Sequence, residues 1–127
     1  MKDEKESGAP RELVDLRIRT RNFAKRVVKL FVALPKTDEA RVLGRQLLRS
    51  GTSVGAHYRE ACRARSDAEF ISKMEVGLQE LDESAYWMEL LIDCHLVPEA
   101  KLQPLRQEAD ELIAILASIV KTKKAKR

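Results

Sequence analysis

One short segment holds the residue types that metal binding or nucleophilic catalysis would need. Ser53, His57 and Glu60 lie three or four residues apart, so they would share one face of a helix. A di-metal centre in a helical bundle needs Glu-x-x-His on two helices and a glutamate from each of two others. The chain has one His-x-x-Glu, in the reversed order, and no second copy. We therefore expect neither a metal nor another cofactor.

Catalysis finds little support in the same segment. One hydroxyl beside one imidazole is a weak signal of a nucleophile and its base. Helical-bundle ribonucleases of prokaryotic toxins carry an arginine and a histidine at a closer spacing than Arg49 and His57, between which seven residues lie. Gly51 and Gly55 fall within an expected helix and not in a phosphate-binding loop. The sequence therefore predicts a protein that is not an enzyme.

Arginines give the clearest chemical signal. On the second expected helix five of them fall within an arc of about 80°, at about 100° per residue. They are Arg41, Arg45, Arg49, Arg59 and Arg63. Guanidinium groups bind phosphates through paired hydrogen bonds, so the arc predicts a track for nucleic acid. Two alternatives stay open, a solvated face and ion pairs with an acidic stripe on the third helix. That stripe consists of Glu75, Asp82, Glu89 and Asp93.

Charge is divided unevenly along the chain. Residues 1–65 carry 16 Lys/Arg against 8 Asp/Glu, and residues 66–98 carry 1 against 8. Such a division indicates either an anionic partner for the basic half or pairing between the halves. The C-terminal lysines Lys121, Lys123 and Lys124 are a second candidate for binding anions.

The elements that must position these residues are four helices. Apolar residues recur at three- and four-residue steps from Leu13 to Leu34 and predict the first, which ends before Pro35. The second is expected over about 38–64, with Thr37 as its N-cap and with one apolar sector that stays in phase through the small residues 50–56. We prefer a continuous helix there to a break, because small residues permit close helix packing.

The third and fourth helices have equally clear signals. Ser66 and Glu69 form a capping box that starts the third helix, which we expect to end near His95. Pro98 starts the fourth helix, and Pro104 should make its first turns irregular. The sequence thus predicts an all-α, antiparallel up-down four-helix bundle over residues 11–120. Residues 1–10 are expected to form a flexible charged tail and residues 121–127 a basic tail.

Bulk composition fits this fold. Only six of the 127 residues are aromatic, so the core should be mostly aliphatic. No stretch approaches the roughly 20 apolar residues that span a bilayer, and the charged first twelve residues do not resemble a signal peptide. We expect a cytoplasmic protein without a membrane partner, a location that suits two unclustered cysteines.

The third helix has more apolar residues than a bundle interior needs. Five lie roughly opposite its main apolar stripe: Val76, Trp87, Leu90, Leu91 and Cys94. An exposed patch with a tryptophan usually marks an interface, so we expect self-association through it. The alternative is that Trp87 covers a loop or helix end of its own protomer.

Two segments are distinctive, RSGTSVGAHYREACRARSDAEF at 49–70 and KMEVGLQELDESAYWMELL at 73–91. Their most recognisable residues are Ser53, Ala56, Glu60, the junction 63–66, Glu69, Phe70, Glu80 and Leu81. Over about residues 16–120 the chain resembles the proteins named after the intervening sequences of bacterial large-subunit ribosomal RNA. His57 stands where the family pattern has Asn, and Ala61 where it often has Gly.

This resemblance implies an antiparallel four-helix protomer that assembles into a ring-like homopentamer. Related accessory proteins of diversity-generating retroelements form the same kind of barrel and bind reverse transcriptase and RNA. We therefore expect a non-catalytic homo-oligomer that binds structured nucleic acid, RNA or DNA, through repeated basic surfaces. The alternative is an adaptor for a protein partner such as a reverse transcriptase, in which the charges pair between subunits.

Overall fold

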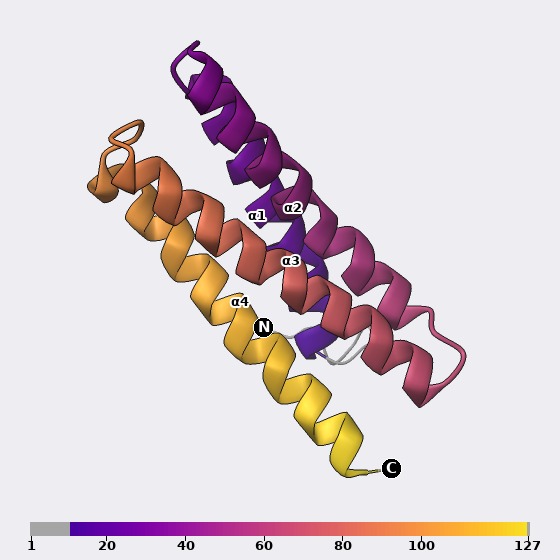
Figure 1. Ribbon diagram of the computed structural model, residues 1–127. Coiled ribbons are helices and arrows are strands. Elements are labelled where there is room, and N and C mark those ends of the chain that lie inside the picture. The colour runs from indigo at the N-terminus through magenta and orange to yellow at the C-terminus, as the bar shows by residue number, and fades with distance from the viewer. Residues whose placement is uncertain (1–10, 127) are drawn as a thin grey trace.

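Four α-helices follow one another in the computed structural model, which describes residues 11–126, with side chains from Leu16 onward. They are α1 (Arg11–Ala33), α2 (Asp38–Cys62), α3 (Asp67–Asp93) and α4 (Glu99–Ala125). Short turns join successive helices, which run antiparallel (Figure 1). The expected all-α four-helix bundle is therefore confirmed. The tail expected over residues 1–10 lies outside the described residues.

The helices begin and end at the residues that the sequence marks. The Thr37 hydroxyl accepts a hydrogen bond from the backbone N–H of Ala40 at the start of α2. At the start of α3, Ser66 accepts from the N–H of Glu69, and the Glu69 carboxylate accepts from the N–H of Arg65. His95 has a left-handed backbone with φ of 61°, which ends α3 and turns the chain toward α4.

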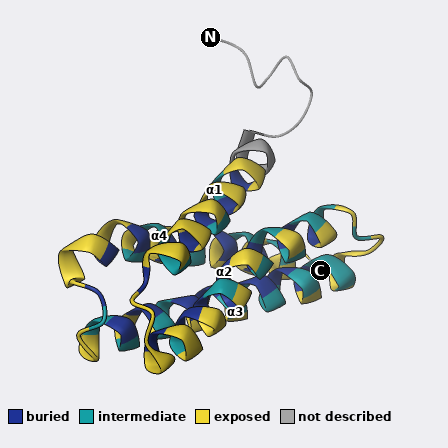
Figure 2. Ribbon diagram, turned by 90° about the horizontal axis from the view of Figure 1, so that it is seen from above, coloured by how far each residue is buried: buried dark blue, intermediate teal, exposed yellow. Residues whose placement is uncertain are grey.

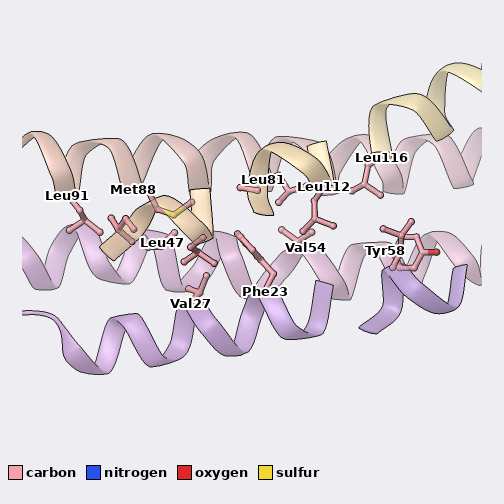
Figure 3. Close-up of a cluster of buried hydrophobic side chains, with 14 of the residues drawn as sticks. Phe23, Val27, Leu47, Val54, Tyr58, Leu81, Met88, Leu91, Leu112 and Leu116 are labelled. Atoms are coloured by element: carbon pink, nitrogen blue, oxygen red, sulfur yellow. The ribbon is translucent and has the colours of Figure 1, made fainter. Parts of the chain in front are cut away.

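An aliphatic core lies along the bundle axis. Figure 3 shows Phe23 and Val27 from α1, Leu47 and Val54 from α2, and Leu81 from α3 pointing into one cluster. Exposed residues cover the outward sides of the helices (Figure 2). Burial of the apolar side chains is the main source of stability in such a fold.

Helix α2 is continuous through the segment of small residues, as predicted. A Cβ atom added at Gly51 would lie 2.8 Å from a methyl carbon of Val27, so α1 packs directly on the backbone of α2. On the other side of α2, the buried hydroxyls of Ser50 and Ser84 lie 2.8 Å apart and join α2 to α3. The small residues of α2 thus allow close packing on two neighbours.

Packing between the helices is uneven. Helix α2 lies between α1 and α3, and α4 packs on α3, whereas α1 and α4 make the smallest of the interhelix contacts. The Arg19 guanidinium bridges that weak side through Glu108, at 2.7 and 3.0 Å, and Glu111, at 2.9 Å. These hydrogen bonds raise the pKa of Arg19, and those to Glu108 contribute most.

Helix α4 differs from expectation at both ends. It passes through Pro104 without interruption, so the irregular first turns are not seen. It also continues to Ala125, so most of the segment expected as a basic tail is helical. Lysine and alanine favour helix, and cations are stabilised near a helix C-terminus. Within residues 11–126 no helix has a stretch long and apolar enough to cross a membrane.

Candidate nucleic-acid interface

The arginines of α2 lie on its outward side. Arg41, Arg45, Arg49 and Arg63 are exposed, and Arg59 is half-buried. The opposite side of the helix carries the buried residues that contact the core. Helix α2 therefore presents four of the five predicted arginines, and Arg63 is the residue that caps its C-terminus.

Arg49 is the arginine of the arc that pairs with α3. Its guanidinium donates to Glu83 and, at 3.2 Å, to Glu80. The hydrogen bond to Glu83 is the main cause that raises the pKa of Arg49. Ion pairing, one of the two alternatives left open by the sequence, therefore applies at this position.

The acidic stripe proposed as the partner of these arginines does not fill that role. Glu75 pairs with Lys124 of α4 at 2.8 Å, and Asp82 and Glu89 line a hollow between α3 and α4. The side of α3 that contacts α2 is occupied by small residues such as Gly77 and Ser84. The heptad-spaced carboxylates therefore lie toward α4.

The other four arginines of the arc have no carboxylate partner among the described residues. No ion pair or side-chain hydrogen bond within residues 16–126 involves Arg41, Arg45, Arg59 or Arg63. Three guanidinium groups of α2 and that of its C-cap residue, Arg63, are therefore available to an external anion.

Helix α1 extends this surface. It meets α2 through Thr20, near Gly55, and Val27, near Gly51. At about 100° per residue the exposed Arg17 and Arg21 follow on the outward side of that contact. They also lack an ion-pair partner within the described residues. We call the surface made by Arg17, Arg21, Arg41, Arg45, Arg59 and Arg63 the basic face.

The residues that could have formed a catalytic or metal site are held in structural contacts. The Ser53 hydroxyl donates to the carbonyl of Arg49 at 2.7 Å. His57 lies 3.4 Å from Glu60 and 3.8 Å from Glu80 through its two ring nitrogens. Lys73 pairs with Glu60 at 3.2 Å. Hydrogen bonds lower the pKa of the Glu60 carboxyl, and the one from Lys73 has a larger effect than the one from His57. No cluster of three or more His, Cys, Asp or Glu suited to a metal occurs in the described part of the chain.

The chain matches a known protein family. Residues 14–118 match the family described as 23S rRNA-intervening sequence protein. The chain belongs to that family.

A solved structure supports the assignment. It is the crystal structure of a protein of unknown function from the S23 ribosomal protein family of Bacteroides thetaiotaomicron. The two chains are 36% identical with a TM-score of 0.81, over 86% of this chain and 97% of the other. None of the curated proteins matches this chain. The comparisons therefore establish the family and leave its function open.

Two of the C-terminal lysines contact acidic or aromatic side chains of α3. Lys123 lies 3.6 Å from Asp67 and 5.0 Å above the ring of Phe70, and Lys124 pairs with Glu75. Lys121 is exposed. Two of the three lysines expected to bind anions thus fasten the end of α4 to α3.

The apolar patch expected on α3 is smaller than the sequence suggested. Leu91 is fully buried in the core, which corrects its assignment to an exposed patch. Val76, Leu90 and Trp87 are half-buried, and Cys94 is exposed. Trp87 packs against the core, and its buried indole N–H has no acceptor among the described residues. Leu91 lies two helical turns after Ser84, which contacts α2, and so shares its side of α3. The buried side of α3 is therefore wider than the apolar stripe predicted from the sequence.

Sequence reasoning missed the most exposed apolar residues. Val32 is 65% exposed, Val42 57% and Ile18 53%, all on α1 or α2. Each interrupts a charged side of its helix, so a periodic pattern assigns it to no stripe. Val32 lies beside Arg41 and Arg45 in a hollow at the end of the α1–α2 pair.

Proposed function

We propose that this family member is a non-catalytic, homo-oligomeric scaffold that binds structured nucleic acid, RNA above all, through the basic face. The observation that carries the proposal is that none of the six arginines of the basic face has a carboxylate partner within residues 16–126. An unpaired guanidinium group exchanges only water for a phosphate, whereas a paired one must first leave its carboxylate.

Assembly would strengthen such a surface. The family resemblance implies a ring-like pentamer, and copies of the basic face around a ring would bind one RNA with avidity. We assign the subunit contact to the outward side of α3, where Val76, Leu90 and Cys94 are at least partly accessible. The exposed ring of Tyr86, which packs edge-on against Trp87 at 5.0 Å, borders this area.

Light scattering tests the contact. Trp87→Ala would also remove core packing, so Leu90→Asp is the sharper change, with Val42→Asp on exposed α2 surface as the matched control. We expect Leu90→Asp to lower the molar mass and the control to leave it unchanged, with both proteins helical by circular dichroism. An unchanged mass for Leu90→Asp would place the subunit contact elsewhere.

RNA binding is tested with the purified full chain and an RNA hairpin across a salt series. Each neutralised phosphate contributes a slope of roughly 0.7–0.9 to the dependence of log affinity on log salt. We expect micromolar or tighter binding near physiological salt, with a slope of several units. Absence of binding even at low salt would overturn the proposal.

A specific observation supports a second candidate. Exposed Ile18 and Val32 lie on α1, which carries part of the basic face, and apolar residues among arginines are common in protein interfaces. The chain would then be an adaptor for a protein such as a reverse transcriptase. Failure to bind RNA together with an intact oligomer would favour this candidate.

A further inference from the structure

A hollow opens at the end of the bundle where α1 turns into α2. Its volume is about 350 Å³. Phe31, Val32, Leu34 and Pro35 form an apolar wall, and Lys36, Arg41 and Arg45 supply the polar part of the lining. No carboxylate from residues 16–126 lines it. The basic face therefore ends in a concave, apolar recess that is edged by cations.

Two contacts set the shape of this end of the bundle. Lys36 donates to the carbonyl of Val32 at 3.1 Å, across the last turn of α1. A Cβ atom added at Gly44 would lie 3.1 Å from the Phe31 ring. The ring can pack closely against α2 because Gly44 has no side chain. The aromatic wall is thus fixed, while Arg41 and Arg45 have no partner within residues 16–126.

A uniform duplex does not use such a recess. The phosphates of a duplex lie on its outside and its bases are stacked inside, so only the rim arginines would contact it. An unpaired base has free π-faces, which stack on aromatic and apolar side chains, while flanking phosphates pair with arginine. Charge and apolar lining together therefore fit a nucleotide whose base is unstacked.

We infer that this hollow accepts an unpaired nucleobase, with Arg41 and Arg45 on the adjacent phosphates, so that the preferred nucleic acid of the protein contains a loop or single strand. The inference rests on the proposed function, because it names the class of nucleic acid that the basic face takes. Exposed Val32 then forms part of the base-binding surface.

The experiment compares two single-stranded oligonucleotides of equal length and charge, one with bases and one abasic at its central positions. Fluorescence anisotropy of the full-length protein measures both affinities at matched salt. We expect the strand with bases to bind about tenfold more tightly, which is the scale of one stacked base. Equal affinities, or no binding of either strand by a protein that binds the RNA hairpin, would overturn the inference and leave the proposed function intact. Failure to bind both strands and the hairpin would overturn both.

Two variants locate the effect. Val32→Asn removes part of the apolar wall without a change in charge, and Val42→Asn makes the same change at an exposed site outside the hollow. We expect Val32→Asn to reduce the preference for the strand with bases to about threefold or less, and Val42→Asn to preserve it. A preference that persists unchanged in Val32→Asn would place the base elsewhere and overturn the assignment of this hollow.

Discussion

Lys123 and Lys124 of α4 and Arg49 of α2 lie against carboxylates of α3, whereas the arginines of the basic face have no carboxylate partner within residues 16–126. Lys123 and Lys124 bind Asp67 and Glu75 of α3, and Arg49 binds Glu80 and Glu83. Arg41 and Arg59, on the same helix as Arg49, have no partner within the described residues. Net charge therefore says little about binding until the pairs are known, since only unpaired cations are free to meet a phosphate.

The two regions also differ in how closely their helices pack. On α2, a Cβ at Gly51 would meet buried Val27 at 2.8 Å, but on α3 a Cβ at Gly77 would meet nothing nearer than 3.9 Å. The platform under the basic face is thus built on direct contact of helix α1 with the α2 backbone. Its arginines are positioned by packing and not by ion pairs.

Glycine substitution should show the largest difference in stability between the regions. We expect Gly51→Ala to lower the free energy of unfolding by about 1–3 kcal/mol, because Val27 is fully buried and stiff. Gly77→Ala should be neutral or raise it by about 0.5–1 kcal/mol, since alanine favours helix. Urea unfolding of both variants checks this, and equal effects would contradict the difference in packing.

Ion pairs should show a smaller difference. Arg19 makes two parallel hydrogen bonds to Glu108 across the weak α1–α4 side, so we expect Arg19→Gln to cost about 1 kcal/mol of unfolding free energy. Arg49→Gln removes a more exposed pair and should cost roughly 0.5 kcal/mol or less. A larger loss for Arg49→Gln in urea unfolding would show that the α2–α3 pair is the stronger support.

Acid should weaken the α1–α4 side by the smallest amount. Hydrogen bonds from Gln107 and Arg19 lower the pKa of Glu111 below its ordinary 4.5, and the one from Gln107 contributes more. A lowered carboxyl pKa contributes stability that is present above the unfolded-state pKa and is lost as the pH falls through the folded-state pKa. The contribution of Glu111 to stability should therefore be constant above about pH 5 and decline as the pH falls below 4.5, and it should be smaller in Arg19→Gln. An identical pH profile for the two proteins would exclude this contribution.

Much of the fold could be predicted from local signals. Thr37, Ser66 and the proline at 98 mark helix starts by hydrogen bonding and backbone restriction, and these effects act over a few residues. The arc of arginines followed from helical periodicity alone. The end of α4 was misjudged because Lys123 and Lys124 are stabilised by residues of α3, which are distant in sequence.

The details of the candidate site depend on tertiary packing. Periodicity shows which residues share a side of one helix, but not which neighbour that side meets. For this reason Leu91 was placed at the surface although it is fully buried, and pairing of Glu75 with α2 was left as an alternative although Glu75 binds α4. The hollow beside Val32 joins two helices at a turn, and no single-helix pattern contains it.

The central claim is that unpaired arginines, and not net charge, bind RNA. Two variants each remove four positive charges. The first changes the unpaired residues Arg41, Arg45, Arg59 and Arg63 to Gln. The second changes the paired residues Arg49, Lys73, Lys123 and Lys124 to Gln. RNA-hairpin affinity and its salt slope are measured for both beside the wild type. We predict that the first variant loses at least tenfold in affinity and roughly 3 units of slope, and that the second loses much less. Equal losses would contradict the claim and leave net charge as the cause of binding.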